Sequence, residues 1–193
     1  MKFILTTSLL FIVFSPLKAQ ELSKADQIIA ATQIIDKTQR ETATVIGYKE
    51  GKQVILRKGT GNFVCLASNP KSNSFSVACY HKDLDPLMAR GRSLKKEGKT
   101  RKEIEAIRAQ EAKTGSLKLP TNPSTLYVLY GQKAHYDKTL KKIVNGKIRY
   151  VVYIPWATAK STGLPLAPQE PGGPWLMFPN TYKAHIMITP PAN

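Results

Sequence analysis

Residues 43–80, ATVIGYKEGKQVILRKGTGNFVCLASNPKSNSFSVACY, decide the fold class of this chain. Short runs rich in β-branched and aromatic residues alternate there with turn-forming segments such as Glu50-Gly51 and Gly59-Thr60-Gly61. The predicted strands are residues 43–48, 53–58, 62–67 and 75–80. Closely spaced strands joined by glycine-containing turns predict an antiparallel meander.

The two cysteines, Cys65 and Cys79, fall on the last two of these strands, so a bridge between them would join neighbouring strands. In an oxidising compartment an even number of cysteines favours a disulfide. Two buried free thiols are the alternative. No sequence feature marks either residue as an activated nucleophile.

The first 19 residues have the layout of a secretory signal peptide, with Met1-Lys2 as a basic start, apolar residues 3–14 and small Ala19 before the expected cut. The apolar run is shorter than the roughly 20 residues that span a bilayer, which favours a cleaved signal over an anchor. We therefore expect a periplasmic or extracellular protein without a transmembrane anchor in the mature chain, residues 20–193.

Outward from residues 43–80, the remaining patterns predict helices and further strands. Ser23 can cap a helix over residues 22–40, Asp85-Pro86 can begin a second, and Thr100 with Glu103 forms a capping box for a third. Asn145-Gly146 between two β-prone runs predicts a type I′ hairpin. The further strands are residues 125–130, 140–144, 147–154 and 184–188. Residues 20–193 should form a single α+β domain with a mainly antiparallel sheet, an N-terminal helix and a two-helix insertion.

Formal net charge is +16, and it falls to +14 when Lys2 and Lys18 leave with the signal peptide. In the cytosol such a charge would indicate nucleic acid. For an exported protein we instead expect the partner to be an anionic glycan, lipopolysaccharide or lipid headgroups. We expect no nucleic-acid partner. A solubilising charge without any partner is the alternative.

Positive charge is concentrated in residues 90–113 and 131–150, and Lys147 and Arg149 lie in the second segment. Aromatic residues lie in or near that segment: Tyr127, Tyr130, Tyr136, Tyr150 and Tyr153. Aromatic rings interleaved with cations can stack on sugars. The alternative is that these rings belong to the core of half-buried strands.

The segment 155–181 is a long Pro- and Gly-rich stretch that carries both tryptophans, Trp156 and Trp175. Such loops are often functional, although a packed irregular wrap is an alternative. Strand alternation places His185 and Met187 on one face of the last strand. If His185 lies beneath the loop that carries Trp175, it could act as a general acid or base. If it instead faces solvent or bonds a carbonyl group, its role is structural.

His81 and Asp83 are weak metal-ligand candidates, with His135 or His185 completing a site. Alternatively, the carboxylates of Asp83 and Asp85 stabilise the positive N-terminal end of a helix. We therefore predict no metal site. The chain also lacks a Gly-x-Ser-x-Gly elbow and a His-Glu-x-x-His motif, and we expect no cofactor.

Several short motifs resemble those of a set of exported bacterial proteins without an assigned activity. The motifs run from Asn62-Phe63-Val64-Cys65 through Leu84-Asp85-Pro86 and Gly173-Pro174-Trp175 to Ala184-His185-Ile186-Met187-Ile188. The resemblance implies a common fold and export, and it transfers no catalytic role.

Together these patterns predict a non-enzymatic, exported binding or accessory protein for an anionic envelope or extracellular component. The expected binding residues are Trp156, Trp175, His185, Lys147 and Arg149. A hydrolase that uses His185 and a purely structural scaffold are the alternatives. The oligomeric state is left open.

Overall fold

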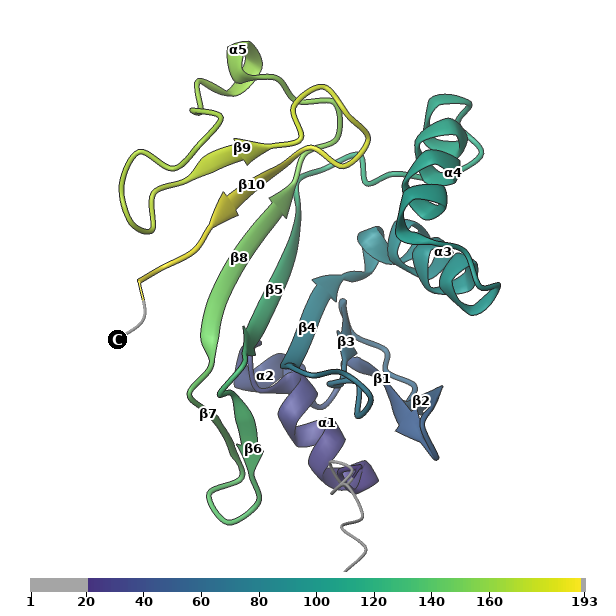
Figure 1. Ribbon diagram of the computed structural model, residues 1–193, viewed down its shortest axis with the longest axis vertical. Helices are drawn as coiled ribbons and strands as arrows, with labels where there is room; N and C mark the ends of the chain where they lie inside the picture. The colour runs from purple at the N-terminus through teal and green to yellow at the C-terminus, as the bar shows by residue number, and fades with distance from the viewer. Residues whose placement is uncertain (1–20, 192–193) are drawn as a thin grey trace, which may run out of the picture.

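An eight-stranded sheet, mainly antiparallel, is the centre of the computed structural model, which describes residues 21–191 (Figure 1). In spatial order its strands are β2 (Lys52–Arg57), β1 (Thr44–Lys49), β3 (Phe63–Leu66), β4 (Phe75–His81), β5 (Ser124–Gly131), β8 (Lys147–Tyr153), β10 (His185–Ile188) and β9 (Trp175–Met177). The predicted single α+β domain is confirmed, with its N-terminal helix and two-helix insertion. The predicted signal peptide lies outside the described residues.

The predicted antiparallel meander is wrong at β3, which pairs with β1 in parallel rather than with β2. The chain after β2 crosses back beside Thr42, where the Gly61 amide donates to the Thr42 carbonyl oxygen at 2.8 Å. A Cβ at Gly59 would lie 2.0 Å from the same oxygen. These glycines therefore allow a close crossing between backbones in addition to a change of direction.

The disulfide prediction is confirmed, because Cys65 of β3 and Cys79 of β4 are bonded and stand directly opposite each other in the antiparallel ladder. Both residues are fully buried. Ala31 packs over them, and its carbonyl oxygen lies 3.0 Å from Cys79 Sγ. The bridge is compatible with export.

The helix predicted over residues 22–40 divides into α1 (Lys24–Thr32) and a short α2 (Lys37–Arg40). Ser23 caps α1 as expected, accepting a hydrogen bond from the Asp26 amide at 3.1 Å. The break follows from Asp36, whose carboxylate accepts from the Thr38 amide and begins α2 as a new helix.

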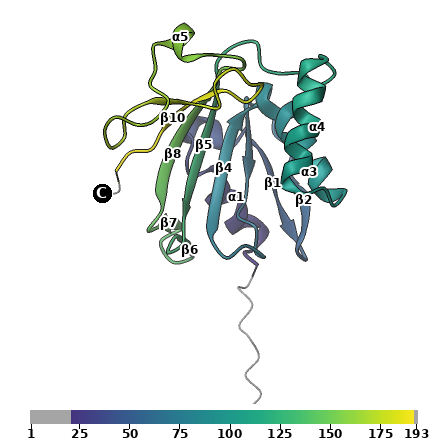
Figure 2. The ribbon, with the colours of Figure 1, turned by 45° about the horizontal axis from the view of Figure 1, so that its top comes forward.

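The inserted helices lie on the face of the sheet opposite to α1 (Figure 2). After the 3₁₀ turn η1 (Lys82–Leu84), they are α3 (Asp85–Lys96) and α4 (Arg101–Lys113). Leu84 and Leu87 are buried against Tyr80 and Val64, whose side chains point away from the α1 face. The predicted capping box of Thr100 and Glu103 is confirmed.

Asp85 is not the N-cap that the sequence predicts. The turn η1 continues directly into α3, so Asp85 is already the first residue of α3 and Leu84 stands at the N-cap. The Asp85 carboxylate instead accepts hydrogen bonds from Tyr80 Oη at 2.7 Å and Arg92 Nη2 at 2.9 Å. It ties α3 to β4.

The hairpin predicted around Asn145-Gly146 is also wrong. β7 (Lys142–Val144) pairs with β6 (His135–Asp137), while β8 pairs with β5. Of the two residues only Asn145 has a positive φ, 56°. A Cβ on Gly146 would lie 2.2 Å from Leu129 Cδ2, so this glycine permits close packing on β5 rather than a type I′ turn.

The long segment 155–181 contains more regular structure than predicted, namely α5 (Ala159–Thr162) and β9. Trp175 is the first residue of β9 and stands opposite Met187 of β10. Within residues 21–191, no helix has the length and apolar character needed to cross a membrane.

Removing the bridge should lower the free energy of unfolding by about 3 kcal/mol, because it closes a loop of about 15 residues in the unfolded chain. Urea unfolding of a Cys65→Ala/Cys79→Ala variant beside wild type measures the loss. Wild type unfolded with reductant present should show a similar loss. Equal unfolding midpoints with and without the bridge would contradict the prediction.

Candidate functional site

The three histidines lie in separate places. His81 ends β4 and caps η1, with its Nδ1 3.4 Å from the Asp83 amide nitrogen and 3.4 Å from Asp83 Oδ2. His135 is exposed on β6, where its Nδ1 contacts the Lys133 carbonyl oxygen at 3.2 Å. Across the described part of the chain, no three His, Cys, Asp or Glu side chains gather into a possible metal site.

His185 is buried, with 6 % of its surface exposed, and its ring lies between those of Tyr153 and Phe178. Its Nδ1 is 2.7 Å from the Lys183 carbonyl oxygen, a distance that assigns the proton to Nδ1 as the donor. Burial lowers the pKa of His185, so the ring is neutral at pH 7. No carboxylate of residues 21–191 is hydrogen bonded to it.

The nearby carboxylate of Glu105 is occupied by other groups. It accepts hydrogen bonds from Lys183 Nζ and from Tyr182 Oη, and so fastens α4 to the segment before β10. Burial acts to raise the pKa of Glu105, but the hydrogen bonds from Lys183 and Tyr182 together with the charges of Lys183 and Arg108 lower it overall. The arrangement gives Glu105 a structural role.

The tryptophans of the predicted binding loop are apart from His185. Trp156 is 46 % exposed, has a positive φ of 66° and lines a shallow cavity of about 450 Å³ together with Pro120 and Pro123. Trp175 is half-buried on β9. Neither Trp175 nor His185 lines any of the cavities described here.

A larger cavity, of about 1200 Å³, opens where the β5–β8 ladder gives way to the β6–β7 hairpin. We call it the Tyr130 cavity. Its lining comes from four distant segments: Ser74, residues 130–133, residues 145–148 with Tyr150, and Pro190-Pro191. Among the residues that the structure describes, the lining includes the cations Lys133 and Lys147 and no carboxylate.

Arg149 adds a third cation beside this cavity. Its guanidinium carbon lies 4.6 Å from the centre of the Tyr130 ring, and its Nη2 donates to Tyr130 Oη at 2.7 Å. Its Nε donates to Thr189 Oγ1 at 3.3 Å, which fixes the side chain between β5 and the end of β10. Among the residues that the structure describes, no carboxylate is within ion-pairing distance of Lys133, Lys147 or Arg149.

A second cavity, of about 300 Å³, lies between α1, the 67–75 segment and β6. The hairpin that forms one wall is held to α1, because Lys141 Nζ is 2.9 Å from Asp26 Oδ1 and the Ile143 amide donates to Gln33 Oε1. The ion pair with Lys141 lowers the pKa of Asp26. Burial raises the pKa of Tyr136, another residue of the lining, to about 12, and the Asp26 charge acts in the same direction.

Comparisons of the chain with protein-family models, with curated proteins and with solved structures found no match. The resemblance to exported bacterial proteins therefore stays a prediction.

The structure thus brings Lys147 and Arg149 together at one cavity and leaves Trp156, Trp175 and His185 outside it. Sequence reasoning missed Ser74, Gln132, Lys133 and the two prolines of its lining. The signal that pointed toward this region was the interleaving of tyrosines with cations in residues 131–150.

The free energy of unfolding should fall as the pH is lowered from 7 to 5, because the buried neutral His185 binds a proton less readily than the unfolded chain does. The stability is fully present above the unfolded pKa of about 6.5 and is lost below it. A His185→Asn variant, whose amide can replace the Nδ1 donor, should lose less over this range in urea unfolding. A matched His135→Asn variant should behave as wild type, and an identical slope for all three proteins would contradict the assignment.

Proposed function

We propose that this protein is a non-enzymatic binding or accessory protein that holds an anionic group, carboxylate or phosphate, of an envelope or extracellular component in the Tyr130 cavity. The observation that carries the proposal is a large cavity with Lys133 and Lys147 in its lining, Arg149 beside it and no carboxylate among its lining residues within 21–191. The predicted signal peptide and the charge of the mature chain support an exported protein with an anionic partner.

Electrostatics support this choice of ligand. Three cations without a carboxylate partner concentrate positive potential at one place, and a bound anion would supply the missing countercharge. Tyr130 and Tyr150 line the same cavity and offer ring surfaces to the apolar faces of a sugar. Arg149 is already held against Tyr130, so little side-chain freedom would be lost on binding.

In the alternative hypothesis, the protein is a hydrolase that uses His185 as a general acid or base. Its buried ring is neutral, as a general base must be, but its contacts are a carbonyl oxygen and two aromatic rings. Without a carboxylate to orient it or a nucleophile beside it, His185 receives less support from its geometry than the Tyr130 cavity does.

A Lys133→Gln/Lys147→Gln variant should bind an immobilised polyuronate more weakly than wild type by roughly fivefold at 0.1 M salt. The estimate assumes that each of the two lost pairings is worth about 0.5 kcal/mol, within the range for exposed ion pairs. The binding of wild type itself should fall steeply toward 1 M salt, where the Debye length shrinks from about 10 Å to about 3 Å. Retention at stepped salt concentrations measures both effects.

The matched control is Lys95→Gln/Lys96→Gln, which removes the same charge from exposed positions at the end of α3. It should bind nearly as well as wild type. Equal losses for the two double variants would mean that net charge alone drives retention, and equal wild-type binding to a neutral dextran matrix would refute an anionic ligand.

A further inference from the structure

The Tyr130 cavity and the smaller cavity beside α1 adjoin each other. Ser74 and Gln132 line both of them. These two residues meet because Phe75 and Gly131 are partners at the end of the β4–β5 ladder, so the residues just beyond them lie side by side. The two cavities therefore lie next to each other at Ser74 and Gln132, one extending toward Pro190-Pro191 and the other toward α1.

The two cavities differ in chemistry. The Tyr130 end carries Lys133 and Lys147, whereas the α1 end is lined by Ser, Asn and Gln side chains above an apolar floor that includes Ala30 and Phe75. Its one carboxylate, Glu21, accepts hydrogen bonds from the Glu50 and Gly51 amides. Apart from Glu21 and His135, the polar side chains of the α1 end are uncharged amides and hydroxyls.

Some of these polar groups are available to a ligand. Asn73 and Gln132 are exposed, and neither side chain is hydrogen bonded to another group of residues 21–191. Gln27, by contrast, is used within the fold, since its amide bonds the Leu22 carbonyl oxygen and both backbone groups of Tyr48. Asn73 and Gln132 flank the junction between the cavities, where a chain passing from one to the other would contact them.

We propose that the ligand is an extended anionic glycan, with a charged sugar unit in the Tyr130 cavity and further units in the cavity beside α1. This inference rests on the proposed function and adds the class and length of the ligand. The free amides donate to and accept from sugar hydroxyls, and the apolar floor fits the faces of sugar rings. An acyl chain in the second cavity would cover its apolar floor but leave the side-chain amides of Asn73 and Gln132 without partners in the complex, so these free amides favour a glycan over a lipid.

Oligogalacturonates of one to four units, titrated into the full mature chain by calorimetry, test the proposal. Wild type should bind the tetramer at least about tenfold more tightly than the monomer, the gain expected from two or so added neutral hydrogen bonds. An Asn73→Ala variant, which changes only the cavity beside α1, should lose part of that gain and still bind the monomer as wild type does. A Gln110→Ala variant, which removes an exposed amide from α4, should behave as wild type.

Equal affinity of wild type for monomer and tetramer would overturn the extended ligand and leave the proposed function intact. Loss of monomer binding in the Asn73→Ala variant, or an unchanged gain for the tetramer, would overturn the division of roles between the two cavities. Displacement of the tetramer by monomeric dodecyl phosphate at lower concentration would overturn the choice of a glycan. Absence of monomer and tetramer binding at low salt would instead refute the proposed function itself.

Discussion

The buried bond between Cys65 and Cys79 is the constraint on which the arrangement of the sheet depends. β3 is short, and it is the strand that joins the β1–β2 pair to the rest of the sheet. The bridge fixes its register against β4, whose ladder with β5 in turn sets β8 and β10. The same bridge forms the surface on which α1 packs. The sheet and the α1 layer are therefore both positioned by this one bond in the core.

The cavities arise where this regular pairing ends. Tyr130 and Lys147 are the last partners of the β5–β8 ladder, and pairing resumes only at His135 and Val144 of the β6–β7 hairpin. Between them one side has four residues and the other two, so the hairpin leaves the ladder and packs against α1 through Lys141 and Gln33. The interruption leaves Gln132 and Lys133 outside any ladder and beside the open space of the Tyr130 cavity.

Local signals in the sequence predicted local structure well. The capping box of Thr100 and Glu103 depends on residues three apart, and the strands containing Cys65 and Cys79 follow from their own composition. Pairing between strands was predicted less well, because it depends on contacts distant in sequence. Asn145-Gly146 has the composition of a tight hairpin, yet β5 and β6 are the strands that satisfy the backbone groups on either side of it. The lining of the proposed site has the same dependence: the sequence singles out Lys147 and Arg149, whereas Ser74 and Pro190 come near them only through the fold.

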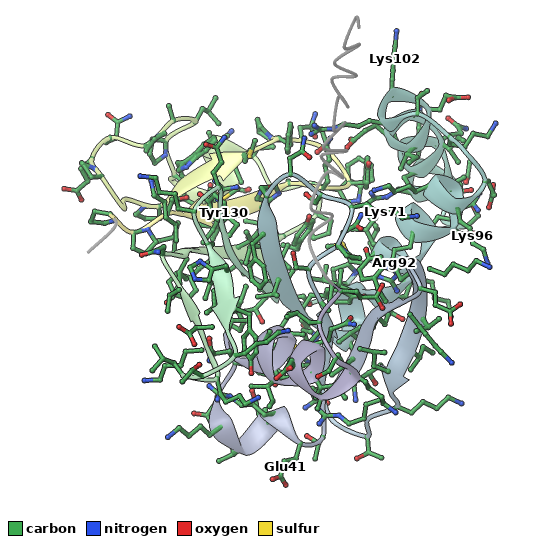
Figure 3. The ribbon with its side chains drawn as sticks, turned by 60° about the horizontal axis from the view of Figure 1, so that its bottom comes forward. Glu41, Lys71, Arg92, Lys96, Lys102 and Tyr130 are labelled. Atoms are coloured by element: carbon green, nitrogen blue, oxygen red, sulfur yellow. A yellow bond between two sulfur atoms is a disulfide. The ribbon has the colours of Figure 1, made fainter. Side chains whose placement is uncertain are left out.

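Net charge alone does not identify the binding surface, because the two basic segments differ in how their cations are used. In the inserted helices Arg90 pairs with Glu111 and Arg92 with Asp85, so much of that charge stabilises the helices themselves. Other cations of the inserted helices, such as Lys96 and Lys102, project outward from the helices and away from Tyr130 (Figure 3). A lysine that projects into bulk solvent loses rotamer freedom on binding and gains little from a screened contact, unless a cavity beside it shields that contact from water. Arg149 is already fixed by Tyr130 and Thr189, and it stands beside a cavity that removes part of a ligand from water. An anion gains most where the cation is held and the contact is partly desolvated, and this condition selects the Tyr130 cavity over the more heavily charged helices.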